Sequence, residues 1–336
     1  MRETILVTEG PFAKGEAVFR AADTFDLQPA PQDESQLARM VVKRNCRAVI
    51  VGALPYVGPL YEALGRTGQG RGAILARFGV GHDSIDKTLA QEHQIVVTNT
   101  PGVLEASVAE HTLWLIGSLA KRIPQFDARM RAGQFTAETG VEVCGKTLGI
   151  IGFGAIGRRV AAIAHFGFRM RVLAVGASVP EQLEHRLGKS LDEIRTTWGL
   201  DAYTGEADEV FRQADIVSLH LPAKPDTRHF VDARRMALMK PGAWLINTAR
   251  GSVVDELALY DALATGRLGG AALDVFQHEP YQPLAPDKDL RTLANVVLTP
   301  HTGSNTVEAN RAMAQAALEN AANFLAGRLE RLNRVA

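Results

Sequence analysis

The sequence predicts an α/β protein built from two domains, each a doubly wound parallel sheet. Short runs rich in Val, Ile and Leu alternate with longer helical patterns along the whole chain, which is typical of parallel βαβ units. The length of 336 residues is about twice the usual size of one domain. A hydrophobic fraction of 46% with 22% charged residues is enough for a sizeable core.

The charge balance and the cysteine content exclude several classes of protein. Lys and Arg total 37, as do Asp and Glu, and no block of like charge occurs, so neither nucleic acid nor a membrane is expected as a partner. Cys46 and Cys144 have no second Cys or His at ligand spacing, which predicts neither disulfides nor a metal site. The most apolar stretch, residues 103–120, carries charged residues and the N-terminus lacks a signal-peptide pattern, so a cytoplasmic location is expected.

The first domain is expected to contain both ends of the chain. Its predicted strands span residues 4–7, 48–51, 73–76 and 95–98, and its predicted helices span residues 36–43, 56–64 and 84–92. The last strand of the chain, residues 296–298, is followed by Thr299-Pro300-His301, so the chain is expected to cross back there. The alanine-rich helix at residues 306–325 would then pack on the first domain, which would comprise residues 1–100 and 300–336.

The second domain, residues 101–299, begins with a long apolar segment. Residues 101–123 are apolar on most faces and end at Pro124, so they are expected to run buried between the domains, with His111 and Trp114 in packing roles. The strands that follow are predicted at residues 147–151, 171–175, 216–219, 243–246 and 271–275, each followed by a helix or a loop.

The strongest local signal is Leu148-Gly149-Ile150-Ile151-Gly152-Phe153-Gly154-Ala155-Ile156-Gly157, a buried-strand pattern that leads into GxGxxG and a helix over residues 158–166. Gly152 permits a tight turn, Gly154 lets a pyrophosphate approach the backbone, and Gly157 allows close helix packing. The helix N-terminus supplies oriented amides and positive potential. Because a strand precedes the glycines and a helix follows them, the motif predicts a Rossmann-like dinucleotide site.

The residues at the end of the next strand, residues 171–175, bear on whether the cofactor is NAD or NADP. An NAD site usually has Asp or Glu about twenty residues on, where it binds the ribose hydroxyls. Here the strand ends in Gly176-Ala177-Ser178, and the nearest acid, Glu181, follows Pro180. Without the carboxylate a 2′-phosphate is not repelled, which favours NADP over NAD. No Arg follows immediately, and Arg186 and Lys189 are candidates only across a loop of unknown course.

Three further segments each place a polar residue just beyond a strand, where open parallel sheets bind ligands. They are Leu245-Ile246-Asn247-Thr248-Ala249-Arg250-Gly251, then Leu273-Asp274-Val275-Phe276-Gln277-His278-Glu279-Pro280, then Leu298-Thr299-Pro300-His301-Thr302-Gly303-Ser304. With them the chain resembles the D-isomer-specific 2-hydroxyacid dehydrogenase family over nearly its whole length, including residues 76–83, 98–103 and 218–222. The resemblance implies a flavodoxin-like substrate domain beside the dinucleotide-binding domain, and a homodimer that could form through residues 103–120.

The resemblance also implies the catalytic groups. Reduction of a 2-keto acid needs a hydride, a proton for the carbonyl oxygen, and a cation that orients the carboxylate. Arg250 matches the family arginine, whose guanidinium stays charged and grips oxygens in a fixed fork. His301 matches the acid/base histidine, and Glu279 matches the carboxylate that orients its imidazole. His278, beside Glu279, does not occupy the family position.

The remaining contacts are implied in the same way. The backbone amides of Val80 and Gly81, together with Arg250, would bind the substrate carboxylate, and Asp274 would hold the nicotinamide carboxamide. Arg77 and His82 flank this substrate loop and could either read the substrate's tail or simply pack. The chain departs from the family in having Gly176 at the usual acidic position and a longer stretch at residues 180–207. The cofactor positions would be Gly152, Gly154, Ala155, Ile156, Gly157, Gly176, Ala177, Ser178, Leu221, Pro222, Thr227, Thr248, Ala249, Asp274 and Gly303.

These observations predict an oxidoreductase that interconverts a small D-2-hydroxy acid and its 2-keto acid with NADP or NAD. Reduction of glyoxylate or hydroxypyruvate is the first expectation, from the resemblance alone. One alternative is a D-3-phosphoglycerate dehydrogenase, in which Arg77 could contact the phosphate. The other is a protein that binds a dinucleotide without turnover, as a sensor or a pseudoenzyme.

Overall fold

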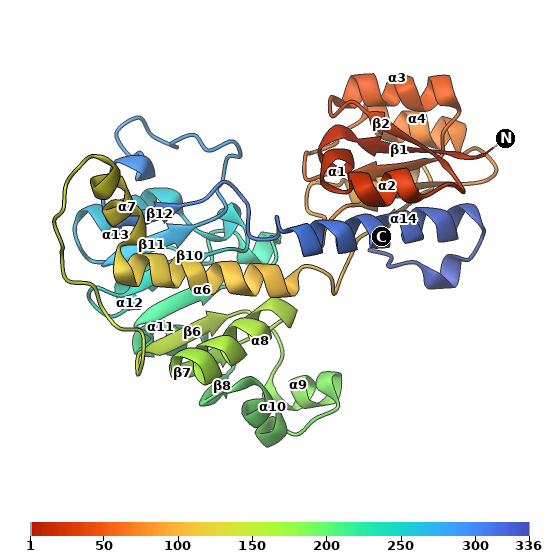
Figure 1. The fold of residues 1–336 in the computed structure, drawn as a ribbon. Helices are drawn as coiled ribbons and strands as arrows, with labels where there is room; N and C mark the ends of the chain where they lie inside the picture. Colours follow the sequence, from red (N-terminus) through yellow and green to blue (C-terminus); the bar gives the residue numbers. More distant parts are fainter. Residues whose placement is uncertain (1, 336) are drawn as a thin grey trace. The chain divides into compact units, whose positions relative to one another are not determined.

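The computed structural model describes residues 2–335, and the chain divides into two compact units (Figure 1). The first unit combines residues 1–104 with residues 305–336, and the second unit comprises residues 105–304. The sequence placed these boundaries after residues 100 and 299. Both units are built on parallel sheets, so the predicted α/β class is confirmed.

The first unit has a five-stranded sheet in the order β2-β1-β3-β4-β5. Its strands are β1 (Thr4–Thr8), β2 (Asp26–Ala30), β3 (Ala48–Val51), β4 (Ala73–Arg77) and β5 (Ile95–Thr98). Four of them coincide with predicted strands to within a residue at the end. The sequence missed β2 because it is an edge strand with the polar sequence Asp-Leu-Gln-Pro-Ala, in which only Ala30 is fully buried.

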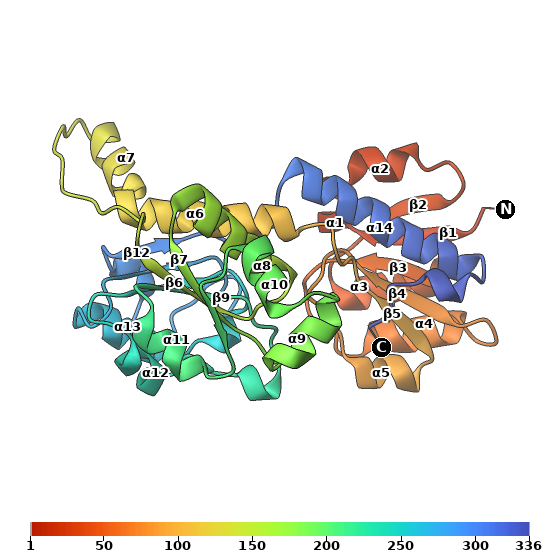
Figure 2. The same ribbon diagram turned by 90° about the horizontal axis from the view of Figure 1, so that it is seen from below.

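Helices cover both faces of this sheet (Figure 2). One side carries α14 (Val307–Leu325), which packs on β3 and β4 together with α1 (Glu9–Lys14) and α2 (Glu16–Ala21). The other side carries α3 (Glu34–Arg44) and α4 (Pro59–Thr67), and α5 (Lys87–Glu92) lies against β5. The helix predicted from residue 56 begins only at Pro59, because Tyr56 is buried in a bridge with Ile85.

The second unit has a seven-stranded sheet in the order β12-β11-β10-β9-β6-β7-β8. The strands are β6 (Thr147–Ile151), β7 (Arg171–Val175), β8 (Ala202–Thr204), β9 (Ile216–Leu219), β10 (Trp244–Asn247), β11 (Gly270–Leu273) and β12 (Val296–Leu298). Four match their predicted bounds, and β10 and β11 are shifted by one or two residues. The sequence missed β8, a three-residue edge strand that is only half-buried.

The helices of the second unit begin with α6 (Glu105–Lys121), which packs on α8, β10, β11 and β12. Helix α6 ends at Lys121, just before Pro124, which lies in the first turn of a second helix, α7 (Ile123–Arg131), that has no buried residue. Trp114 is 69% exposed, so its predicted packing role is wrong. The others are α8 (Ala155–Ala162), its π-helical extension η1 (Ile163–Gly167), α9 (Pro180–Leu187), α10 (Leu191–Trp198), α11 (Ala207–Gln213), α12 (Ala233–Leu238) and α13 (Glu256–Ala264).

The strand order locates the site in the second unit. The chain runs from β6 outward to β7 and β8, then returns to β9 on the opposite side of β6. Open parallel sheets bind ligands beyond the carboxyl ends of the strands at such a reversal. Among residues 2–335, no helix is long and apolar enough to cross a membrane, and no cluster of His, Cys, Asp and Glu could hold a metal ion.

Candidate active site

The glycine turn after β6 has the geometry that a dinucleotide requires. Gly152 has φ +104°, and a Cβ there would lie 2.5 Å from the carbonyl oxygen of His220. A Cβ on Gly157 would lie 2.2 Å from the carbonyl oxygen of Gly152. Above Gly154, by contrast, nothing lies within 4 Å. Two glycines therefore permit close packing and the third leaves open space where a pyrophosphate can approach.

Helix α8 begins directly at this open space. Gly154 is its N-cap residue and no side chain caps it. The first turn contains no acidic residue, so the amides of Ala155 and Ile156 and the positive end of the helix dipole face an anion without competition from a carboxylate. The residues present at this turn fit a nicotinamide dinucleotide.

The segment after β9 forms the neighbouring wall of the turn. The hydroxyl of Thr227 donates to the carbonyl of Pro222 at 2.7 Å and accepts from the amide of Lys224 at 2.9 Å, so it shapes this loop. His220 lies 3.0 Å from the hydroxyl of Ser218, and burial lowers the pKa of its ring to about 3. His220 is therefore neutral at working pH and cannot supply a proton.

The loop after β10 carries Arg250. The side chain of Asn247 holds the loop at both ends, because its oxygen accepts from the amide of Ala249 at 3.0 Å and its nitrogen donates to the carbonyl of Arg250 at 2.9 Å. A Cβ on Gly251 would lie 1.9 Å from the carbonyl carbon of Phe276. The Arg250 loop thus lies directly against the loop that follows β11.

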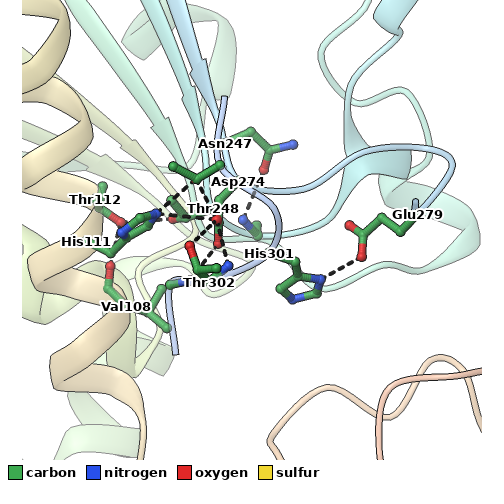
Figure 3. Close-up of polar contacts among 12 residues, drawn as sticks. Val108, His111, Thr112, Asn247, Thr248, Asp274, Glu279, His301 and Thr302 are labelled. Atoms are coloured by element: carbon green, nitrogen blue, oxygen red, sulfur yellow. Dashed lines mark hydrogen bonds and ion pairs between the residues drawn. The ribbon is translucent and has the colours of Figure 1, made fainter. Parts of the chain in front are cut away.

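Asp274, the first residue after β11, organises the loop after β12 (Figure 3). Its carboxylate is 2% exposed and accepts from the amides of Thr302 and Gly303, both at 2.8 Å, and from the hydroxyl of Thr299 at 2.6 Å. His111 Nε2 is 3.3 Å from the same carboxylate. Burial by itself raises the pKa of Asp274, but these donors hold it below its ordinary value. A permanent anion therefore fixes the loop that carries the candidate acid.

Two residues of α6 reach this network, which the sequence did not indicate. His111 also lies 3.1 Å from the hydroxyl of Thr299, so its role is polar and the packing expectation was incomplete. The hydroxyl of Thr112 lies 2.9 Å from that of Thr248, a predicted cofactor residue (Figure 3). The available signal was two adjacent polar residues within an apolar helix.

His301 and Glu279 form a hydrogen-bonded pair (Figure 3). Nδ1 of His301 is 2.7 Å from one oxygen of Glu279, and the other oxygen accepts from the amide of Phe276 at 3.1 Å. His301 has φ +52°, and its amide donates to the carbonyl of Asp274 at 2.8 Å. Because Nδ1 is engaged by the carboxylate, Nε2 is left to exchange a proton. Both side chains are more than a third exposed.

A buried carboxyl group, that of Glu256, holds the backbone of the same loop two residues before Glu279. Glu256 accepts from the amide of Gln277 at 2.5 Å, and burial raises its pKa. The contacts therefore run without a break from Gly251 to Phe276, from Phe276 to Glu279, and from Glu279 to His301. The three adjacent strands β10, β11 and β12 bring the predicted trio to one edge of the sheet, where a carboxylate orients the imidazole of His301.

Val80 and Gly81 lie in the first unit, after β4. Gly79 donates its amide to the hydroxyl of Thr100 at 3.0 Å, and the side chain of Asn99 donates to the carbonyl of Val80 at 2.9 Å. Within residues 2–335, no hydrogen bond from the amides of Val80 or Gly81 is found. The loop that carries these two donors is thus held by the two residues that follow β5 (Ile95–Thr98), and the donors remain available to an anion.

Comparisons with known proteins agree with this geometry. The family model described as D-isomer specific 2-hydroxyacid dehydrogenase, NAD binding domain, matches residues 113–303. The glyoxylate reductase of Pyrococcus furiosus is 38% identical over 265 residues, which cover 76% of this chain and 74% of that protein. The D-3-phosphoglycerate dehydrogenase of Methanocaldococcus jannaschii is 38% identical over 259 residues, but the chain spans only 46% of its length. The NADPH-dependent glyoxylate/hydroxypyruvate reductase of Sinorhizobium meliloti, solved with NADP and malonate, is 27% identical, with 97% of this chain and 94% of that chain covered and a TM-score of 0.79.

Proposed function

This chain belongs to the D-isomer-specific 2-hydroxyacid dehydrogenase family, and on that premise we propose that it reduces a small 2-keto acid to the D-2-hydroxy acid with NADPH. It is an oxidoreductase of the NAD(P)-dependent class that acts on CH–OH groups. The observation that carries the proposal is the Glu279–His301 pair, which stands on the sheet that also bears the dinucleotide turn. We assign the dinucleotide to the glycine turn of the second unit.

The side chains have complementary tasks in this proposal. The bound nicotinamide supplies the hydride. Arg250 binds the substrate carboxylate, together with the amides of Val80 and Gly81, and draws electron density from the carbonyl. Protonated His301 gives its Nε2 proton to the carbonyl oxygen, and Glu279 stabilises the imidazolium beforehand. In the oxidative direction, neutral His301 accepts the hydroxyl proton.

We propose glyoxylate or hydroxypyruvate as the substrate, because curated relatives that share three quarters of their length with this chain carry those names. NADPH oxidation should be followed with glyoxylate, hydroxypyruvate, pyruvate, phenylpyruvate and 3-phosphohydroxypyruvate. We expect kcat/KM for glyoxylate or for hydroxypyruvate to be at least about tenfold higher than for each of the other three keto acids, a preference worth about 1.4 kcal/mol. A clear preference for phenylpyruvate would contradict the assignment.

A D-3-phosphoglycerate dehydrogenase activity is the second candidate, favoured by the match to the Methanocaldococcus jannaschii protein. Arg77 ends β4 three residues before Val80 and hydrogen-bonds to the carbonyl of Phe78. It would be the phosphate contact in that case. A preference for 3-phosphohydroxypyruvate in the same panel would select this candidate, and NADPH binding without turnover of any keto acid would select a non-catalytic dinucleotide-binding protein.

We also propose a homodimer, formed through exposed apolar side chains on α6, α7 and the loop that follows. Most apolar residues of α6 are buried within its own unit, so the surface would instead use Trp114, Met130 and Phe135, the last of which is 92% exposed. Light scattering should give about twice the chain mass of 36.3 kDa. The double substitution Trp114→Glu and Phe135→Glu should halve that mass, whereas Val57→Glu, at an exposed apolar position of the first unit, should not. A single-chain mass for the unaltered protein would exclude the dimer.

Both cysteines are free thiols, Cys46 buried and Cys144 exposed. Exposed free thiols persist in reducing compartments, where glutathione keeps them reduced. We therefore propose that the protein works in the cytoplasm.

A further inference from the structure

The helix pair α9–α10, residues 180–198, connects β7 to β8 at one edge of the second sheet (Figure 1). Both helices end at a glycine in the left-handed conformation, Gly188 and Gly199, and α10 starts at a capping box formed by Ser190 and Glu193. The pair is thus a well-formed element. Hydride transfer as described above uses none of it.

At the end of β7, Tyr203 occupies the space into which a side chain at position 176 would extend. A Cβ on Gly176 would lie 2.6 Å from the hydroxyl oxygen of Tyr203. That hydroxyl donates to the carbonyl of Ser178 at 2.7 Å, and the ring makes an edge contact with Phe153 at 5.8 Å. Tyr203 is therefore fixed, and any side chain at position 176 would displace it. A carboxylate at position 176 would require Tyr203 to move and to give up its hydrogen bond to Ser178.

Arg158, in the first helical turns of α8, shares one neighbour with this position, Phe153. Its guanidinium stands 5.6 Å from the ring centroid of Trp198 on α10, and one terminal nitrogen donates to the carbonyl of Phe153 at 3.3 Å. Its Nε is buried and has no hydrogen-bond partner among residues 2–335. A guanidinium held this way has donors to spare and presents a fixed fork to a planar or tetrahedral anion.

A second cation shares the same neighbourhood. Arg186 lies in the last turn of α9, and its charge, after burial, lowers the pKa of Arg158 and opposes the burial-driven rise in the pKa of Tyr203. In the part of the chain that the structure describes, neither arginine forms an ion pair with a carboxylate. Two arginines in one neighbourhood add to the positive potential that an anion would neutralise there.

We propose that Arg158 and Arg186 bind the 2′-phosphate of NADP(H), and that the helix pair α9–α10 serves to position them. The inference rests on the proposed dinucleotide site and adds the residues that select between its two forms. The sequence has no arginine directly after β7, and the helix pair would replace it. Helix α9 supplies the guanidinium of Arg186, and Trp198 of α10 orients that of Arg158. A phosphate dianion offers enough oxygens for both forks.

The test uses fragments of the cofactor, so it does not depend on turnover. Binding of 2′,5′-ADP and of 5′-ADP to the full chain should be measured by isothermal titration calorimetry. We expect 2′,5′-ADP to bind at least about tenfold more tightly. Arg158→Gln and Arg186→Gln should each weaken 2′,5′-ADP binding by about tenfold and change 5′-ADP binding by less than about twofold. Arg212→Gln, an exposed arginine at the end of α11, is the matched control and should change neither.

The outcomes separate this inference from the proposed function. Equal affinity of the unaltered chain for the two fragments, or 2′,5′-ADP binding that survives the Arg158→Gln, Arg186→Gln double substitution, would overturn the inference and leave the dinucleotide site intact. Failure of both fragments to bind would overturn the proposed function itself. Circular dichroism melting of each variant shows whether a loss reflects unfolding, and retained 5′-ADP binding provides the same check within the titration.

Discussion

Substitution of His301 by Ala is expected to lower kcat for keto-acid reduction by about 10³-fold, within the range that a positioned general acid contributes. The Kd of NADPH should stay within about twofold, because the substitution leaves the glycine turn and its amides unchanged. Steady-state kinetics and a fluorescence titration of NADPH with the same preparations measure the two quantities. His278→Ala is the matched control: His278 adjoins Glu279 in sequence but does not pair with it in the structure, and its loss should leave kcat within about threefold.

A second substitution distinguishes His301 as the proton donor from His301 as a residue that only shapes the loop. His301→Gln keeps a hydrogen-bonding side chain but cannot carry a transferable proton, so it should be as inactive as the alanine variant. Retention of more than about a tenth of kcat in either variant would contradict the assignment, since loss of a general acid lowers the rate by about 10²-fold or more.

Substitution of Arg250 by Lys is expected to lower kcat/KM by about 10²- to 10³-fold even though the positive charge is retained. A lysine ammonium is a point charge and cannot grip a carboxylate through two parallel hydrogen bonds while it polarises the adjacent carbonyl. The backbone that presents position 250 is held by Asn247 and by the close approach of Gly251 to Phe276, so the variant should fold normally.

Initial rates over a range of keto-acid concentrations give kcat/KM for the Arg250→Lys variant and for the unaltered chain. Arg171→Lys is the control. Arg171 is the exposed first residue of β7, so it lies at the amino end of the strands, whereas Arg250 follows the carboxyl end of β10. The kcat/KM of the Arg171→Lys variant should remain within about twofold of the unaltered chain. An Arg250→Lys variant with nearly full kcat/KM would mean that charge alone suffices, and that the bidentate arrangement is not part of the mechanism.

The sequence predicted the strands that read as apolar runs, including the edge strands β5 and β12, and missed the other two edge strands, β2 and β8. β6, β7 and β9 read as continuous apolar runs because helices cover both sides of a parallel sheet. β2 and β8 are edge strands whose residues stay partly exposed, so their sequences carry no such run. Their existence depends on pairing with β1 and β7, which is a tertiary event.

In the candidate site, the catalytic residues could be predicted from the sequence, and the contacts that hold them could not. Arg250, Glu279 and His301 could be identified because each follows a recognisable strand in a segment of specific sequence. Their supporting contacts could not, since they join residues far apart in the chain: His111 meets Asp274, and Tyr203 stands over Gly176 only because β8 pairs with β7. His111 reads as one more residue of an apolar helix until the loop after β12 is placed beside it.

The role of His301 and of the nicotinamide site can be read from the product of a single reaction, that of hydroxypyruvate with NADPH. The unaltered chain is expected to form D-glycerate in a one-to-one ratio with oxidised NADPH, as measured by chiral chromatography and absorbance of the same sample. The His301→Ala variant, which should still bind NADPH, would form almost none. Formation of L-glycerate, or equal rates with and without His301, would contradict the assignment of this site as the place where hydride and proton are delivered.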